Sequence, residues 1–384
     1  MCKIRTLKLC DMMLIFKYLP VFVFLHCLLV SPVHAGSENS LKTFDNAQLS
    51  KLSIPPGTDP LAFAYDCLAS LALYSQERSG GGLKRAVTAA DKLISMQAVD
   101  DNQRLGWSYL QEKTEKTKKC GQPGALDAFG DGTCNPPGTP YMIQTGYGIA
   151  CLAQLSIATG DTKYLTSAKK AVADSWKLGT NLPGCKECYY YWYSYHPNDR
   201  NRYVRNTNLI MGYGLAWLYA ATGNASYRER ALSIAQAEHR EIVAGNFGYF
   251  GIDDPKYRAN PKMESQRIEN HIPHQVKALK DISALLGTPS AAKDAVTMLD
   301  AFLNCTNERC RPDNCKSWAA PVACKATATI APCILADQSA VYRLRCDQVR
   351  GELKKLNAFQ TFMLFGPESA DLLSKGSTPV TTKP

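Results

Sequence analysis

The stretch Leu152-Ala-Gln-Leu-Ser-Ile-Ala-Thr-Gly160 aligns without a gap to Leu215-Ala-Trp-Leu-Tyr-Ala-Ala-Thr-Gly223, which begins 63 residues later. A third copy runs from Leu279 to Gly287, and an earlier one begins at Leu68. Self-similarity at a fixed period of this size is typical of proteins that repeat one supersecondary unit. The alignment therefore predicts that a single structural unit recurs along the chain.

Each repeat has the pattern of a helical hairpin. Its first helix is apolar on nearly every side and ends at a glycine, the residue that best tolerates the left-handed backbone after a helix. Asp161 or Asn224 follows and suits the N-cap of the next helix. In the second unit that next helix carries an apolar residue at every fourth position from Tyr164 to Trp176. A helix that is apolar all round is buried and a striped one faces solvent, so we expect an inner and an outer helix per unit.

Aromatic, strand-like connectors follow the outer helices, at residues 106–109, 189–196 and 248–254. Together with the repeat period, these connectors resemble those of the α/α-toroid carbohydrate-active superfamily, which includes six-hairpin glycosidases and toroid polysaccharide lyases. The resemblance covers about residues 59–304. It implies an all-α fold, an incomplete α/α-toroid of four to five helical hairpins, to which residues 326–364 would add the fifth.

The first 35 residues have the features of a secretory signal peptide: a basic start, an apolar run from Tyr18 to Val30 and a small residue, Ala35, at the expected cleavage point. We expect a linker over residues 36–58 and a secreted or periplasmic protein with no stable membrane anchor. Removing the leader lowers the formal charge from +10 to +7. This charge suits an acidic partner or simply a solvated surface. Because the basic residues are not clustered, nucleic acid is not an expected partner.

Twelve of the 15 cysteines follow the leader, and an even number in an oxidising compartment favours disulfides. Cys185 and Cys188 are expected to close a small disulfide loop, and Cys120 could pair with Cys134. Two cysteines in apolar helical runs, Cys67 and Cys151, could be buried thiols or a bridge. Six more crowd residues 305–366, a segment expected to be helical and cross-linked, and residues 367–384 have the composition of a disordered tail.

Two dense polar stretches, residues 196–208 and 264–274, lead directly into inner helices. Aligned by the repeat, Gln144, Thr207 and His271 stand at one position near the start of successive inner helices. If these helices surround a common centre, such residues would face one mouth. The alternative is that the polar groups only cap helices and satisfy one another in the loops, since caps and turns favour Asn, Asp and Thr.

The adjacent pair Asn270-His271 resembles the arrangement in toroid uronate lyases, where Asn and His neutralise the substrate carboxylate and a Tyr acts as acid and base. The resemblance implies Tyr249 as the proton carrier and Arg205 or Arg267 as the cation, although Tyr249 precedes the pair. Removing a proton beside a carboxylate requires donors that stabilise the developing charge. The expected catalytic residues are His271, Asn270, Tyr249, Arg205 and Glu269.

Sugar rings stack on aromatic faces, so the aromatic connectors and the polar stretches together supply the expected substrate contacts. The same aromatic side chains could instead pack beneath the loops. The residues expected to bind substrate are Tyr191, Trp192, His196, Arg202, Asn206, Asn208, Gln144, Arg267 and His274.

The leading hypothesis is a polysaccharide lyase that cleaves an acidic, uronate-containing polysaccharide or oligosaccharide by β-elimination. The runner-up is a glycoside hydrolase that uses Glu269 with Asp254 or Asp199, since glycoside hydrolysis needs two carboxyl groups. The composition of Asp253-Asp254-Pro255, however, favours a turn over a catalytic role. A third hypothesis is a non-catalytic toroid that binds a glycan or a protein.

Cofactor chemistry is not expected. The chain has no phosphate-binding loop, nucleophile elbow or dinucleotide fingerprint. His271 and His274 would be the candidates for a metal site, but a proline lies between them and zinc ligands are usually spaced more regularly. The sequence therefore predicts neither a cofactor nor a metal.

Overall fold

A computed structural model describes residues 60–77, 80–100, 102–108, 135, 138–262, 268, 271–304, 331, 335 and 342–344. The expected leader, linker and tail therefore lie outside the described residues. So does most of the expected fifth hairpin.

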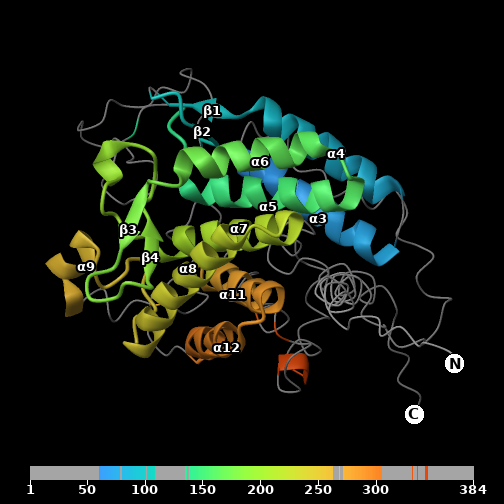
Figure 1. Ribbon diagram of the computed structural model, residues 1–384. Helices are drawn as coiled ribbons and strands as arrows, with labels where there is room; N and C mark the ends of the chain where they lie inside the picture. Colours follow the sequence, from blue (N-terminus) through green and yellow to red (C-terminus); the bar gives the residue numbers. More distant parts are fainter. Residues whose placement is uncertain are drawn as a thin grey trace, which may run out of the picture. The chain divides into compact units, whose positions relative to one another are not determined.

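Four helical hairpins make up the described part of the chain (Figure 1). Their inner helices are α3 (Pro60–Glu77), α5 (Met142–Thr159), α7 (Arg205–Thr222) and α11 (Ile272–Leu286). Their outer helices are α4 (Gly80–Ser95), α6 (Thr162–Ser175), α8 (Ala225–Val243) and α12 (Pro289–Leu303). Two short helical segments, η1 (Pro197–Asp199) and α9 (Pro255–Ala259), lie in the connectors.

The inner helices form one continuous layer: α3 packs on α5, α5 on α7, and α7 on α11. Each outer helix packs on the inner helix of its own hairpin, so α4, α6, α8 and α12 form a second layer. The first 12 residues of α5, from Met142 to Ala153, are all buried, as the all-round apolar pattern predicts. The expected division into inner and outer helices is confirmed.

Glycine ends the inner helices at the predicted positions. Gly160, Gly223 and Gly287 have φ of 73°, 67° and 66°, the left-handed region that other residues avoid. The carboxylate of Asp161 then accepts a hydrogen bond from the backbone N–H of Lys163 at 2.9 Å. This cap satisfies one of the free N–H groups that begin α6, and Asn224 caps α8 in the same way.

Close packing between α5 and α7 also requires glycine. A Cβ added at Gly146 would lie 2.6 Å from the backbone oxygen of Ile210, and one at Gly214 would lie 2.5 Å from the backbone oxygen of Gly146. Since real Cβ atoms do not approach backbone so closely, the two helices can touch at this height only because these residues have no side chain.

Short strands form at or beside two of the three expected connectors, whereas in residues 248–254 Phe250 makes only an isolated antiparallel bridge with Val204. β1 (Ala98–Val99) pairs antiparallel with β2 (Leu105–Gly106), and β3 (Gly179–Asn181) pairs antiparallel with β4 (Tyr189–Tyr191). Thr180 lies opposite Tyr190 in the second pair. The side chains of β4 are all buried, which places an aromatic layer beneath the connector.

Two disulfides are present among the described cysteines. Cys67 and Cys151 join α3 to α5 across 84 residues of sequence, which settles the alternative that the sequence left open. Cys185 and Cys188 form the expected small loop between β3 and β4. Cys120, Cys134 and the late cysteines lie outside the described residues.

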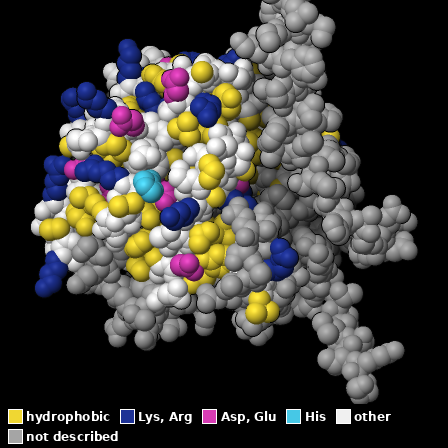
Figure 2. Space-filling view, turned by 60° about the horizontal axis from the view of Figure 1, so that its bottom comes forward, with side chains coloured by type: hydrophobic (Ala, Val, Ile, Leu, Met, Phe, Trp, Pro, Cys, Tyr) yellow, Lys and Arg dark blue, Asp and Glu magenta, His cyan; other side chains and the backbone are white. Residues whose placement is uncertain are grey.

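Within the described ranges, the model contains no helix that is both long and apolar enough to cross a membrane. On the face shown in Figure 2, basic side chains are spread over the surface with acidic side chains between them. This distribution agrees with the sequence, in which the charge is basic but not gathered into one segment.

Candidate functional site

The four inner helices bring together a group of titratable residues that we call the tyrosine–histidine cluster. It consists of Tyr65 on α3, Tyr147 on α5, Tyr213 on α7 and His274 on α11. The hydroxyl of Tyr147 lies 3.0 Å from Nδ1 of His274. The ring of Tyr147 also lies 4.7 Å from that of Tyr65 and 6.2 Å from that of Tyr213, between ring centroids. Tyr147 is therefore the centre of the cluster.

The repeat explains why Tyr147 and His274 meet. Each stands five residues before the leading leucine of its unit, Leu152 or Leu279, so the two occupy the same position in the second and fourth repeats. The intervening unit has Ile210 there. His274 was expected at the site, whereas Tyr65, Tyr147 and Tyr213 were not, because tyrosine in an apolar helix also fits an ordinary core. Comparing this repeat position would have identified Tyr147.

Burial perturbs the cluster strongly. The three tyrosines are less than a tenth exposed, and His274 is partly buried. Burial, and to a lesser degree the neighbouring Tyr213, raises the pKa of Tyr147 far above its usual range. Burial also raises the pKa of Tyr213 to about 12. Burial, and then the adjacent His271, lowers the pKa of His274 to about 3. At neutral pH the pair thus consists of a protonated phenol and an uncharged imidazole.

Helix α11 adds further polar groups beside the cluster. His271, at the N-cap of α11, lies 6.2 Å from His274 between ring centroids. Tyr249 lies 6.3 Å from His271 on the same measure. One turn further along α11, Nζ of Lys277 lies 2.9 Å from the carboxylate of Asp281 and 5.9 Å from the ring centroid of Tyr213. Of the expected catalytic residues, His271 and Tyr249 are thus brought near one another.

Such an arrangement suits proton transfer. A neutral imidazole can accept a proton, a protonated phenol can donate one, and a hydrogen bond between them lets a proton pass from one to the other. Low exposure strengthens the interactions of any charge that develops. Strongly perturbed titratable groups that converge from different elements are typical of functional sites.

Arg205 differs from its expected role as a substrate cation. Its side chain is fully buried, and its Nε lies 3.3 Å from the carboxylate of Glu238, which is also fully buried. Its Nη1 donates to the backbone oxygen of Gly248 at 2.9 Å, and its Nη2 donates to Glu238 as well. The guanidinium therefore ties α7 to α8 and to the connector before Tyr249 and does not face a substrate.

Asn208 and Asn206, expected to bind substrate, are buried at the start of α7. The side chain of Asn208 accepts from the backbone N–H of Tyr191 at 3.0 Å and donates to the backbone oxygen of Tyr189 at 3.4 Å, so it attaches β4 to α7. Oδ1 of Asn206 accepts locally from the backbone N–H of Thr207. These contacts match the alternative in which the polar stretch satisfies loops and helix ends.

Gln144 is fully buried near the start of α5, and its side-chain amide has no hydrogen-bond partner in the described part of the chain. A buried amide without a partner costs roughly 1–3 kcal/mol. The structure offers no physical reason for this arrangement.

Arg202 and Asp254 form a buried ion pair in which Nε lies 3.3 Å from the carboxylate. Asp254 also caps α9, accepting from the backbone N–H of Lys256 at 2.8 Å. Asp253 pairs with Arg240 and Arg258, each at 2.7 Å. The Asp-Asp-Pro sequence is thus a helix cap with its carboxylates engaged, as its turn composition indicates, and this removes support from the hydrolase pair that contains Asp254.

The aromatic connector packs inward. Tyr191 is 1% exposed, and burial raises its pKa well above the usual range. The guanidinium of Arg230 on α8 lies 3.6 Å from the ring centroid of Tyr189 and 5.8 Å from that of Tyr191. Trp192 is partly exposed, with the guanidinium of Arg200 5.6 Å from its ring centroid. Of these residues, Trp192 keeps a surface on which a sugar could stack.

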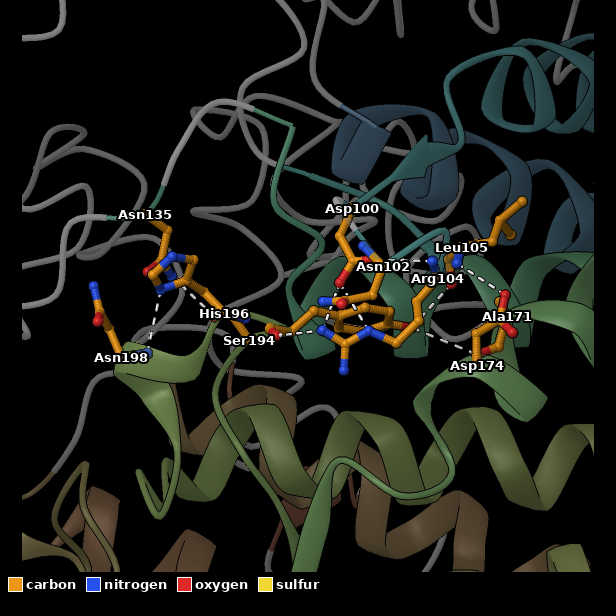
Figure 3. Close-up of polar contacts among 11 residues, drawn as sticks. Asp100, Asn102, Arg104, Leu105, Asn135, Ala171, Asp174, Ser194, His196 and Asn198 are labelled. Atoms are coloured by element: carbon orange, nitrogen blue, oxygen red, sulfur yellow. Dashed lines mark hydrogen bonds and ion pairs between the residues drawn. The ribbon is translucent and has the colours of Figure 1, made fainter.

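His196 lies at the start of η1, close to Ser194 and Asn198 (Figure 3). Its ring Nδ1 accepts a hydrogen bond from the backbone N–H of Asn198 at 3.2 Å, and its backbone N–H donates to the hydroxyl of Ser194 at 3.1 Å. Nearby, Arg104 donates to the carboxylate of Asp100 and to the backbone oxygen of Tyr195 at 2.8 Å. These contacts hold the connectors together.

Three expected site residues, Asn270, Glu269 and Arg267, lie outside the described residues. Their proposed roles are neither supported nor opposed by the geometry. Among the residues that the structure does describe, no three His, Cys, Asp or Glu side chains are grouped so that they could hold a metal ion.

In a comparison with protein families, residues 101–288 match the family model described as "D-glucuronyl C5-epimerase C-terminus". The matched range includes Tyr147, Tyr213 and His274. Comparison with curated protein sequences finds no match.

Solved structures show the same fold at low sequence identity. Cellobiose 2-epimerase from Bacillus thermoamylovorans B4167 is 12% identical over 77% of this chain and 76% of its own, with a TM-score of 0.51. The enzyme of the same name from Spirochaeta thermophila DSM 6192 is also 12% identical, over 77% and 74%, with a TM-score of 0.51. D-mannose isomerase is 12% identical over 89% of this chain and 100% of its own, with a TM-score of 0.55. The chain therefore has the α/α-toroid fold of these structures.

Proposed function

We propose that the protein acts on a uronate-containing glycan by removing the proton at C5 of the sugar ring and returning a proton to the opposite face. The observation that carries this proposal is the Tyr147–His274 pair, a phenol and a neutral imidazole joined at 3.0 Å among buried inner helices. The match to the C-terminal part of D-glucuronyl C5-epimerase supports the choice of substrate and outcome.

Proton movement can be followed through the two side chains. In one tautomer, Nδ1–H of His274 donates to the oxygen of Tyr147, which leaves Nε2 with a lone pair. Nε2 takes the C5 proton, the C5–H electron pair moves toward the carboxylate, and the hydroxyl of Tyr147 then donates its proton to C5. The imidazolium returns the Nδ1 proton to the phenolate, so both groups end uncharged.

Two neighbours assist these steps. A hydrogen bond from Tyr65 works against the rise in the pKa of Tyr147 and so favours its transient phenolate. Because the pKa of His274 is lowered, its imidazolium is a strong acid and readily returns the proton. Sugar contacts would come from Trp192, a connector aromatic that is partly exposed.

Beta-elimination is the second candidate. The specific observation in its favour is that Tyr249 lies beside His271, as the resemblance to toroid uronate lyases implies. It begins with the same loss of the C5 proton, but the intermediate then expels the group at C4 and the chain is cleaved. Elimination and epimerisation therefore differ in the product and not in the first step.

Heavy water separates these possibilities. The mature protein is incubated in it with a panel of uronate polymers, and deuterium at C5 is measured by NMR together with ultraviolet absorbance of unsaturated uronates. Deuterium at C5 without cleavage supports the proposal. Ultraviolet absorbance supports elimination, because C5 of the unsaturated product carries no hydrogen and so no deuterium is expected there. Neither signal on any polymer contradicts both. His274→Gln should abolish exchange, whereas His239→Gln, which alters a histidine paired with Asp294 on the outer layer, should not.

The compartment belongs to the proposal as well. Two disulfides among the described cysteines support the expected oxidising environment, because such bonds are rare in reducing cytosol. We propose that the protein is exported and meets its glycan outside the cytoplasm.

A further inference from the structure

Lys277 and Asp281 form an ion pair on α11 that differs from an ordinary surface pair. A matched pair exists on the outer layer, where Nζ of Lys170 lies 3.0 Å from Asp174 with the same spacing of four residues. The Lys170 side chain is 56% exposed, whereas that of Lys277 is 23% exposed. Burying an ammonium group requires compensation, so the position of Lys277 calls for an explanation that Lys170 does not need.

The direction of Lys277 supplies part of that explanation. Its Nζ lies 5.9 Å from the ring centroid of Tyr213. Its charge acts to lower the pKa of Tyr147 and Tyr213 against the effect of burial, whereas the carboxylate of Asp281 acts to raise both. The ammonium therefore lies within electrostatic range of two tyrosines of the cluster. A positive charge held there can interact with any anion that enters beside them.

The spacing along α11 fits one sugar residue. Lys277 follows His274 by three residues, which corresponds to about 4.5 Å along a helix axis. In a uronate, the carboxylate is bonded directly to C5. A sugar with C5 at His274 would therefore place its carboxylate toward Lys277.

We infer that Lys277 is the anchor for the substrate carboxylate and that Asp281 is the positioning residue that holds it in place. The inference rests on the proposed function and names a specificity-determining residue for that site. When C5 loses its proton, negative charge grows on the carboxylate, and a nearby ammonium stabilises this charge more than that of the ground state. Lys277 should thus affect both selection of uronates and the rate of exchange.

The test measures binding and exchange separately. Binding of a uronate polymer is compared with binding of the same polymer after its carboxyl groups have been reduced to alcohols, and C5 exchange is followed in heavy water. Lys277→Met should lose the preference for the uronate polymer and lose about 100-fold in exchange, the effect typical of removing one transition-state donor. Lys277→Arg, which keeps the charge, should retain the preference.

The matched control is Lys170→Met, which removes the same charge from the outer pair and should change neither quantity. Asp281→Asn should weaken the preference less than Lys277→Met does, since the cation remains. Thermal unfolding is measured for every variant to establish that each is folded. If Lys277→Met does not fold, Lys277→Arg still tests whether a positive charge at this position preserves the preference for uronate.

Each result bears on one idea. Normal exchange and normal preference in Lys277→Met would overturn the anchor and leave the proposed function standing. The wild-type protein could instead show no exchange but prefer uronate, with that preference lost in Lys277→Met. This result would overturn the proposed function and support the anchor. A wild-type protein that shows no preference for uronate over the reduced polymer would overturn the anchor.

Discussion

The start of α7 and the tyrosine–histidine cluster both place polar groups in a buried setting, but the two regions satisfy them differently. At the start of α7, Arg205 forms an ion pair with a carboxylate and donates a hydrogen bond to a backbone oxygen. Asn208 forms hydrogen bonds with two backbone groups. In the cluster, the hydroxyl of Tyr147 and Nδ1 of His274 form a hydrogen bond along which a proton can pass. The first region is held by charges and dipoles that are permanently paired, whereas the second keeps its titratable groups uncharged.

The difference shows that burial has two consequences for polar residues. Where a partner of opposite charge is present, the buried group stays ionised and contributes to attachment of one element to another. Where it is absent, the pKa moves until the neutral form dominates, and the group becomes available for proton transfer. Mutations should therefore affect stability in the first region and activity in the second.

The largest effect is expected from Tyr147→Phe. It should lower C5 exchange roughly 100- to 10,000-fold, the range for loss of an acid–base group, because the phenylalanine cannot donate or accept a proton. Stability should fall by only about 1 kcal/mol for the lost hydrogen bond. Exchange kinetics and urea unfolding measure the two quantities.

The matched control is Tyr164→Phe on α6, which also removes one tyrosine hydrogen bond, to Asp91 at 3.0 Å. It should cost similar stability and leave exchange unchanged. If both variants lost exchange equally, the cluster would have no special role in exchange, and the proposed difference between the two regions would be wrong.

Arg205→Met should have the largest effect on stability. Removing one partner of a buried ion pair leaves Glu238 uncompensated, and such changes cost about 3–5 kcal/mol. The free energy of unfolding in urea should fall accordingly. Lys293→Met, which removes an exposed charge from α12, serves as the control and should be nearly neutral.

A double variant, Arg205→Met with Glu238→Leu, sharpens this prediction. It removes both buried charges, so part of the lost stability should return. If the double variant were no more stable than Arg205→Met, an uncompensated charge could not be the cause.

Several features of the fold could be predicted from sequence because they depend on local rules. Gly160 and Gly223 end helices where only a left-handed backbone fits, and Asp161 caps the next helix. Such signals act within a few residues, so the repeat alignment detects them. The bridge between Cys67 and Cys151 was left open, since pairing across 84 residues depends on how α3 and α5 pack.

The site could be predicted less well for the same reason. Polar residues such as Arg205 and Asn208 stand out in a sequence, yet their partners, Glu238 and the backbone of β4, are distant in the chain and turn them into structural groups. Tyr147 does not stand out, because an aromatic residue in an apolar helix resembles core. Its proposed role depends on His274, which contacts it only once α5 and α11 lie in one layer.

The two regions should also respond to acid in opposite directions. The folded pKa of His274, about 3, lies below its ordinary value of 6.5. Below pH 6.5 the unfolded chain therefore binds a proton that the folded chain refuses, and stability falls as the pH falls toward the folded pKa. At about pH 5 this amounts to roughly 2 kcal/mol, which His274→Gln should remove. Urea unfolding between these pH values measures it.

Glu241, beside Arg205, provides the contrast. Burial raises its folded pKa, so its contribution to stability is fully present below the ordinary value of 4.5 and is lost as the pH rises through the folded pKa. Glu241→Gln should make the variant relatively more stable than wild type as the pH rises from 4.5, the opposite trend to His274→Gln. If the stability of both variants relative to wild type changed in the same direction with pH, the proposed contrast between the two regions would be wrong.

Asn208→Ala is expected to have the smallest effect of the series. Its side chain accepts from Tyr191 N–H at 3.0 Å and donates weakly to the Tyr189 oxygen at 3.4 Å, so its loss should cost about 1 kcal/mol in urea unfolding. Exchange should keep its rate, because β4 is also held by its pairing with β3. Asn198→Ala in the exposed loop is the matched control and should cost less. A strong loss of exchange in Asn208→Ala, with stability intact, would instead return this residue to the substrate-binding role that the sequence predicts, and the start of α7 would then belong to the site.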